Sequence, residues 1–248
     1  MVVKTKIDSR IKKTKKEVLS HNKRQISKTE SKKLKDSFER DGFLCVEEGM
    51  SEINQEDLME EILESMNRNR VDTWETKLRM QTLMQETPEA LKAMNRIKEY
   101  AELIVGVDYK IPENQKLREF ASLTSFPGCK AQCWHRDSTE KDAVLITGFM
   151  NLYQTKKENG ALQVIKGSHK NIKWLEEIKL DNISTIELPA KSLTFIDSRL
   201  IHRGGSNTSA CEIRPVIYAS FGQGDLKEPG YFLDEKLSEK YRIQPAKI

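Results

Sequence analysis

The sequence has no long hydrophobic run. Its longest apolar stretch covers roughly residues 143–150 and is interrupted by Thr147 and Gly148. A transmembrane helix needs about 20 consecutive apolar residues, so we expect no membrane span. The first residues, MVVKTKIDSR, contain no apolar segment of the kind that a secretory signal requires, so we do not expect secretion.

Cysteine is also scarce. The 248 residues contain four cysteines and no CxxC pair. Disulfide scaffolds occur mainly in short, cysteine-rich secreted chains, so we expect none here. We therefore predict reduced thiols and a cytoplasmic location.

Acidic residues are rare near the N-terminus. Residues 1–35 contain thirteen Lys or Arg and three Asp or Glu, a net charge of +10, and no Phe, Tyr or Trp. Because the whole chain carries +4, the remaining residues carry −6. We predict a solvated, flexible or partly helical extension over residues 1–35 and one domain over residues 36–248. A contact of the basic extension with nucleic acid or an anionic surface, and a transit peptide, are the alternatives.

Hydrophobic spacing changes along the rest of the chain. Residues 54–67 and 88–106 have apolar residues at the intervals of an amphipathic helix. The turn Asp41-Gly42 separates a helix end from a short strand, and from Ser122 onward strand-like runs alternate with Gly, Pro and Asn. This pattern predicts an α+β fold in which a β-sandwich or barrel carries the functional site.

The segment CWHRD contains the first candidate metal ligands. Residues two apart on a strand point to the same face, so His135 and Asp137 would project together. With four His and twelve Asp in the chain, about 0.2 such pairs arise by chance, so the pair alone is weak evidence. His202 follows a strand-like run sixty-seven residues later. Two His and one carboxylate form the facial triad of non-haem Fe(II) oxygenases, whereas zinc sites more often use three His, two His and Glu, or Cys.

Arg214 lies in the apolar strand-like segment RPVIYASF. Alternation places Arg214 and Tyr218 on one face of that strand. A buried guanidinium needs an anion, because an unpaired buried charge is very costly. A dicarboxylate co-substrate would supply one through a bidentate contact, and a structural ion pair with an acidic residue is the alternative.

These motifs occur together in one order: FERDGF, FPGCKAQCWHRD, ENGALQVIKGSHK and TFIDSRLIHRGGSNTSACEIRPV. In this order the chain resembles the phytanoyl-CoA dioxygenase-like (PhyH) family of Fe(II)- and 2-oxoglutarate-dependent oxygenases, over roughly Phe38 to Phe221. The resemblance implies a double-stranded β-helix (jelly-roll) core with flanking N-terminal helices. It also implies Fe(II), 2-oxoglutarate and O₂ as cofactor and co-substrates.

The resemblance assigns roles to single residues. His135, Asp137 and His202 would be the iron ligands, Arg214 would bind the distal carboxylate of 2-oxoglutarate, and Phe149 would line the co-substrate pocket. Asp137 favours oxygen transfer, because a halogenase would have Gly or Ala at this position.

One position departs from the family pattern. Many members have Ser or Thr two residues after the distal His as a second co-substrate ligand, and Gly204 occupies that position here. We expect the missing hydroxyl to come from Thr194, Ser206 or Ser220.

The implied reaction is hydroxylation, or another oxidation, of a small molecule with release of succinate and CO₂. The candidate substrate-binding residues are Gln132, Trp134, Asn151 and Tyr218, although strand alternation directs some of them away from the metal. His169 is expected to have a structural role in a turn. A non-catalytic jelly-roll metal-binding or regulatory protein, and a metal-dependent hydrolase or lyase on the same fold, are the alternative functions.

Overall fold

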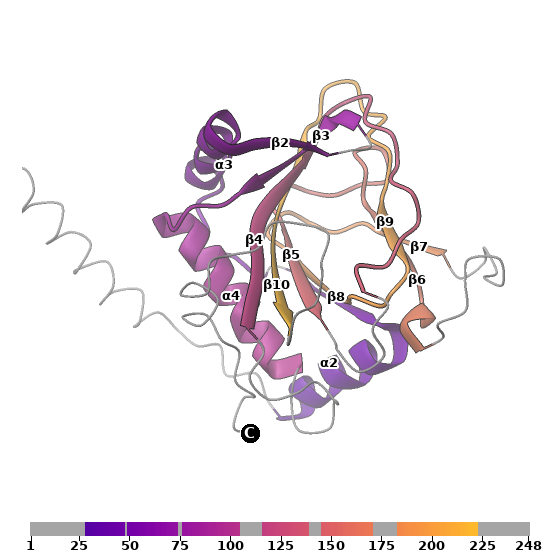
Figure 1. The fold of residues 1–248 in the computed structure, drawn as a ribbon. Helices are drawn as coiled ribbons and strands as arrows, with labels where there is room; N and C mark the ends of the chain where they lie inside the picture. Colours follow the sequence, from indigo (N-terminus) through magenta and orange to yellow (C-terminus); the bar gives the residue numbers. More distant parts are fainter. Residues whose placement is uncertain are drawn as a thin grey trace, which may run out of the picture.

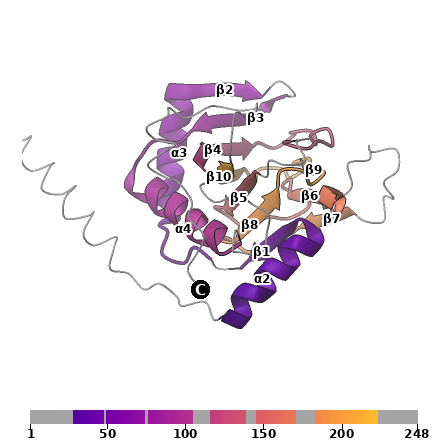
Figure 2. The ribbon, with the colours of Figure 1, turned by 60° about the horizontal axis from the view of Figure 1, so that its bottom comes forward.

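The structure is a computed structural model that describes residues 28–47, 49–73, 76–104, 116–138, 145–170 and 183–222. Two antiparallel sheets face each other, and helices cover the outer face of the larger one (Figures 1 and 2). The described helices are α2 (Lys28–Asp41), α3 (Gln55–Asn69) and α4 (Pro88–Ile104), with the 3-10 helix η1 (Ser168–Lys170). The strands are β1 (Phe43–Val46), β2 (Arg70–Thr73), β3 (Thr76–Leu83), β4 (Lys116–Ser125), β5 (Ile146–Asn151), β6 (Leu162–Ile165), β7 (Ile183–Ile186), β8 (Leu193–Asp197), β9 (His202–Gly204) and β10 (Arg214–Gly222).

The large sheet has seven strands in the order β1-β8-β5-β10-β4-β3-β2, and the small sheet has the order β7-β6-β9. Neighbours in space are mostly distant in sequence, as in a jelly roll. Figure 2 shows the large sheet from β2 at the top to β1 at the bottom, with α3 and α4 on one side and the small sheet on the other. This arrangement confirms the predicted α+β jelly-roll fold with flanking helices.

The two faces of the large sheet belong to different hydrophobic clusters. Side chains of one face, such as Phe195 and Ile217, pack against Met94 and Ile97 of α4 in the main core. Side chains of the other face, such as Phe149, join Val164 of the small sheet in a second cluster. Strand alternation therefore separates a structural face from an inner face, and the inner face is where polar residues can meet a ligand.

Helix α4 lies close to the large sheet because of one glycine. It starts at Pro88, a residue suited to the first helical position, and buries Ala93, Ile97 and Ala101 at helical spacing. A Cβ at Gly148 of β5 would lie 2.6 Å from Cε1 of Phe195 and would also clash with Ile97. Only glycine at this position leaves room for the helix.

The predicted helices and the turn after Asp41 are confirmed, but three features differ from the sequence prediction. Helix α2 begins at Lys28 and so crosses the predicted domain boundary at residue 35, while residues 1–27 lie outside the described part. Strands β2 and β3 were not expected before Ser122. The segment around His135 is not a full strand, because it pairs through an isolated bridge. Among the described helices, none is long and apolar enough to cross a membrane.

Candidate metal centre

Three candidate ligands converge between the two sheets. Nε2 of His135 lies 3.7 Å from Oδ1 of Asp137, and Nε2 of His202 lies 3.6 Å from the same oxygen. All three ligand atoms lie within 4.8 Å of one another. This spacing suits three ligands on one face of a single metal ion.

Backbone pairing brings these distant segments together. His135 and His202 form an isolated antiparallel bridge, with N–H···O distances of 3.1 and 2.9 Å in the two directions. The Asp137 N–H donates to the Ser198 carbonyl at 2.9 Å. Residues sixty-seven positions apart are thus fixed side by side before any side chain binds a ligand.

Both imidazoles are oriented by a carbonyl two residues earlier in their own segment. Nδ1–H of His135 donates to the Cys133 carbonyl at 2.9 Å, and Nδ1–H of His202 donates to the Leu200 carbonyl at 2.9 Å. A neutral imidazole that donates through Nδ1 presents its Nε2 lone pair on the other side. The hydrogen bonds therefore assign the tautomer in which both Nε2 atoms can bind a metal.

Burial is uneven across the three residues. His202 is 5% exposed, and burial lowers the pKa of its imidazole, so the ring is neutral near pH 7. The side chains of His135 and Asp137 are 35% and 21% exposed, so the cluster opens to solvent on their side. Two imidazole nitrogens and one carboxylate oxygen, with one open side, fit Fe(II) in a facial triad.

A second polar group on the inner face contains two buried arginines. Arg79 of β3 and Arg214 of β10 both lie directly opposite Ser125 of β4. Arg79 is 0% exposed and Arg214 is 6% exposed. Nε of Arg79 and Nη2 of Arg214 both donate to Oγ of Ser125, at 3.2 and 3.3 Å.

Burying the positive charges of Arg79 and Arg214 close together is energetically costly unless an anion binds nearby. Arg214 forms no ion pair within the described residues, and its Nε has no hydrogen-bond partner. Burial, together with the positive charge of Arg79, lowers the pKa of Arg214 to about 10. A bound carboxylate would accept a hydrogen bond from Nε of Arg214 and offset the repulsion between the two guanidinium groups. The sequence prediction missed Arg79, although the alternation in TKLRMQTL was a strand signal that could have revealed it.

Gly204 makes room for Arg79. A Cβ at Gly204 would lie 3.2 Å from Nη2 of Arg79 and 2.8 Å from Oε1 of Gln132. Nη2 of Arg79 donates to the Gly205 carbonyl at 2.8 Å, immediately before Ser206. The side chains of Gln132 and Arg79 therefore crowd the position where a Ser or Thr side chain at residue 204 would begin.

The candidate hydroxyls are placed differently. Thr194 lies opposite Phe149, and its Oγ1 contacts Sγ of Cys45 at 3.9 Å. Ser220 shares the inner face, and its Oγ lies 3.0 Å from Oγ1 of Thr147. A co-substrate contact by Thr194, Ser206 or Ser220 stays a prediction.

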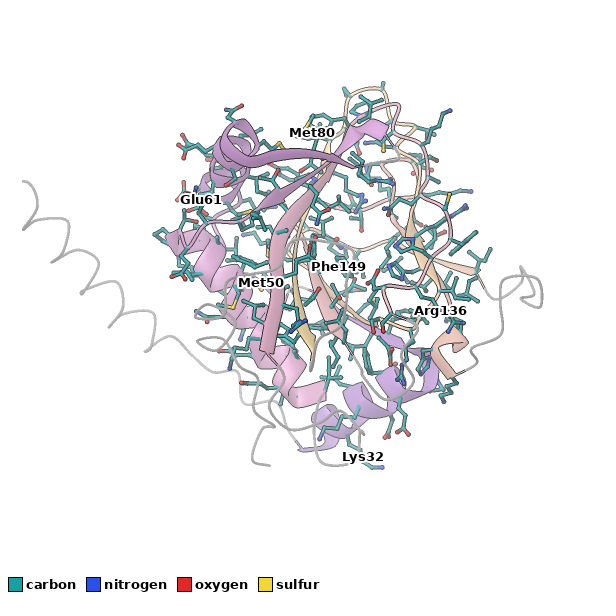
Figure 3. All side chains as sticks on the ribbon, in the orientation of Figure 1. Lys32, Met50, Glu61, Met80, Arg136 and Phe149 are labelled. Atoms are coloured by element: carbon teal, nitrogen blue, oxygen red, sulfur yellow. The ribbon has the colours of Figure 1, made fainter. Side chains whose placement is uncertain are left out.

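Two of the predicted pocket residues lie on the inner face of the large sheet. Phe149 and Tyr218 lie opposite each other with ring centroids 5.8 Å apart, and Phe149 is seen on the side of the large sheet that faces the small one (Figure 3). The Tyr218 hydroxyl donates to Oε1 of Glu119 at 2.6 Å and accepts from Nε2 of Gln81 at 2.5 Å. Burial, followed by the charge of Glu119, raises the pKa of Tyr218, so its phenol stays neutral. The hydroxyl is thus engaged within the protein.

The other predicted substrate residues bond to the protein. Oε1 of Gln132 accepts from the Gly204 N–H at 2.9 Å, and Nδ2 of Asn151 donates to Oγ1 of Thr155 at 3.4 Å. Trp134 stacks against the guanidinium of Arg203, on the face of the segment opposite to His135. This placement counts against a substrate contact by Trp134.

His169 lies apart from the triad, in η1. Its Nε2–H donates to the Glu39 carbonyl of α2 at 3.1 Å, and burial lowers its pKa. This contact links η1 to α2, which agrees with the structural role expected from the sequence.

Comparison with known families identifies the family to which the chain belongs. The sequence profile described as "Phytanoyl-CoA dioxygenase (PhyH)" matches residues 38–216, which is most of the chain. The chain belongs to the PhyH family. Iron and 2-oxoglutarate, the cofactors predicted from the sequence, are those of this family of oxygenases.

Single relatives add to this result. "Dioxygenase af480" of Aspergillus fumigatus is 27% identical to this PhyH member over 116 residues, which cover 44% of this chain and only 38% of that protein. The solved structure of the epimerase SnoN in complex with Fe3+, alpha ketoglutarate and nogalamycin RO has a TM-score of 0.66 and 15% identity, and covers 85% of this chain and 98% of that one. The non-heme alpha ketoglutarate dependent carbocyclase SnoK has a TM-score of 0.63 and 14% identity, and covers 86% of this chain and 95% of that one. At such low identity these structures show the shared fold.

Proposed function

We propose that this PhyH protein is an Fe(II)- and 2-oxoglutarate-dependent dioxygenase that hydroxylates a C–H bond of a small organic molecule and releases succinate and CO₂. One observation carries this proposal. A two-His, one-carboxylate cluster lies between the two sheets, and Arg214 on the inner face of the large sheet has no acidic partner among the described residues. A metal hydrolase would require the metal ligands, but its reaction would not require Arg214.

The chain's own residues have separate roles in this proposal. His135, Asp137 and His202 would hold the iron, with both Nε2 atoms directed to it by the carbonyls that accept from Nδ1. Together, Fe(II), 2-oxoglutarate and O₂ supply an oxidant strong enough to remove hydrogen from a C–H bond. Arg214 would bind the distal carboxylate of the co-substrate.

Arg79 would contribute a second positive charge to the same anion site. It shares Ser125 with Arg214, and both side chains are withdrawn from solvent. In such a site, charge-assisted hydrogen bonds are strong and water competes poorly. The two guanidinium groups therefore favour a dianion such as 2-oxoglutarate over a monocarboxylate.

Phe149 and Tyr218 would form an aromatic wall between the anion site and the rest of the inner face. Their ring contact at 5.8 Å, and the hydrogen bonds of Tyr218 to Glu119 and Gln81, hold this wall in place. A fixed apolar wall excludes water and orients a substrate. The complex of SnoN with nogalamycin RO supports a small-molecule substrate.

Anaerobic addition of Fe(II) and then 2-oxoglutarate tests the proposal. We expect a visible metal-to-ligand charge-transfer band that is absent from His135→Ala, Asp137→Ala and His202→Ala, while all three variants stay folded. A parent protein without this band would contradict the proposal. If the band forms, substrate-stimulated succinate release and a product heavier by one oxygen would identify hydroxylation, and a product of unchanged mass would instead indicate epimerisation.

A further inference from the structure

The segment that carries His135 and Asp137 is held to the rest of the small sheet by few backbone contacts. Within the described residues it pairs with β9 through the single bridge between His135 and His202. Beside this bridge, backbone hydrogen bonds join Gln132 to Gly204 at 2.9 Å, and Asp137 and Ser138 to Ser198 at 2.9 and 3.1 Å. Such a short ladder leaves the two ligand-bearing segments free to twist relative to each other unless side chains also join them.

Side chains on the opposite face make that connection. His202 lies opposite Val164 of the inner cluster, so the adjacent pair Arg203 and Gln163 must face outward. The Arg203 guanidinium carbon lies 4.3 Å from the centroid of the Trp134 ring, within the range of a cation–π contact. Each metal-binding histidine is therefore backed by one partner of this stack.

Hydrogen bonds extend the stack across the small sheet. Nε of Arg203 donates to Oε1 of Gln163 at 2.7 Å, and Nε2 of Gln163 donates to Oγ1 of Thr185 at 3.3 Å. The guanidinium is thus fixed on one side by an amide and on the other by an aromatic ring. The contacts run from β7 through β6 and β9 to the segment of His135.

We propose that Trp134, Arg203 and Gln163 form an outer clamp that positions the metal ligands. The clamp acts through the backbone: it sets the distance between the segments of His135 and His202, whose rings lie 4.4 Å apart. This proposal rests on the proposed metal centre and gives Trp134 a positioning role in place of a substrate contact. Residues that orient metal ligands from outside typically change metal affinity by about 10- to 100-fold when they are replaced.

Metal affinity of the full chain tests the clamp without any need for a substrate. We expect Trp134→Ala and Arg203→Ala each to weaken Fe(II) binding by about 10- to 100-fold in anaerobic equilibrium titrations. Because either change breaks the same contact, the Fe(II) affinity of the double variant should be little lower than that of the more strongly affected single variant. The charge-transfer band with 2-oxoglutarate should also shift or broaden, which a loss of stability alone would not cause.

Matched variants keep the test decisive. Arg96→Ala removes a guanidinium carbon 5.7 Å from the Tyr100 ring centroid on α4, far from the candidate ligands in sequence, and should leave Fe(II) affinity unchanged. Trp134→Phe retains a ring face and should bind Fe(II) with an affinity within about threefold of the parent. Arg203→Gln removes the cation and should bind Fe(II) more weakly than that. These two variants keep the test possible even if the alanine variants do not fold. Parent-like iron affinity in Arg203→Gln and in both alanine variants would overturn the clamp alone. A parent protein that binds no Fe(II) would overturn the proposed function as well.

Discussion

Replacing Arg214 by methionine separates the cost in stability of a buried guanidinium from its proposed role in binding 2-oxoglutarate. Burial lowers the pKa of Arg214 from 12.5 to about 10, which corresponds to about 3 kcal/mol against the charged form. At pH 7 the guanidinium is charged in both the folded and the unfolded chain, so this cost is fully present. It would disappear only as the pH rises through the folded and then the unfolded pKa.

Two opposite effects are therefore expected from Arg214→Met. Without co-substrate, the variant should be more stable than the parent by about 1–3 kcal/mol, because methionine fills similar space and carries no charge. With Fe(II) bound, its affinity for 2-oxoglutarate should fall by about 30-fold to several thousand-fold, since a desolvated charge contact contributes roughly 2–5 kcal/mol. Arg214→Lys should recover only part of that affinity, because an ammonium group cannot form the bidentate contact.

The assays are urea unfolding of the metal-free protein and anaerobic titration of the Fe(II)-loaded protein with 2-oxoglutarate, followed by the charge-transfer band. Arg96→Met is the matched control, since Arg96 is paired with Glu99 at 2.8 Å and with Glu52 at 3.4 Å. That control should lose stability and keep co-substrate affinity. If Arg214→Met is less stable than the parent and binds 2-oxoglutarate normally, Arg214 is a structural residue and the reasoning fails.

Three further outcomes are expected. Removal of residues 1–27, which precede α2, should leave 2-oxoglutarate binding unchanged, and a loss of binding in the folded variant would assign these residues to the site. Because burial lowers the pKa of His169 below 6.5, the unfolded chain takes up a proton first as the pH falls. The free energy of unfolding should therefore drop by up to about 1.4 kcal/mol per pH unit as the pH falls below 6.5. His169→Gln should show a flatter pH dependence in urea unfolding, and an unchanged dependence would contradict a role for this histidine. Gly148→Ala should lower the free energy of unfolding by about 1–3 kcal/mol, measured by thermal unfolding, and adding Ile97→Ala should recover part of that loss. Additive losses in the double variant would contradict the close packing of α4 against Gly148.

The sequence predicted those parts of the fold that depend on local pattern. The apolar spacing of α3 and α4, and the turn between α2 and β1, are visible in the order of residues alone. The predicted ligands could also be found, because His135 and Asp137 stand in a short motif with a recognisable partner in His202. Their convergence within 4.8 Å agrees with that prediction, and their role as ligands stays a proposal.

Other features depend on tertiary contacts that no local pattern records. Arg79 looks like an ordinary strand residue until the pairing of β3 with β4 brings it beside Ser125 and close to Arg214. Strand alternation already directs Trp134 away from His135, but only the bridge to His202 brings it beside Arg203. Which neighbour a side chain meets depends on strand order, and strand order in a jelly roll is mostly non-local.

The two carbonyls that fix the imidazoles have a consequence for metal selectivity. Since Cys133 and Leu200 already hold the rings of His135 and His202, folding rather than metal binding bears the entropic cost of orienting them. A site prepared in this way accepts any divalent ion that prefers imidazole and carboxylate ligands. The intrinsic affinity order then favours Co²⁺, Ni²⁺ and Cu²⁺ over Fe²⁺. If the three residues bind a metal as proposed, the identity of that metal would depend on which ions are available, and traces of Co²⁺, Ni²⁺ or Cu²⁺ would act as inhibitors.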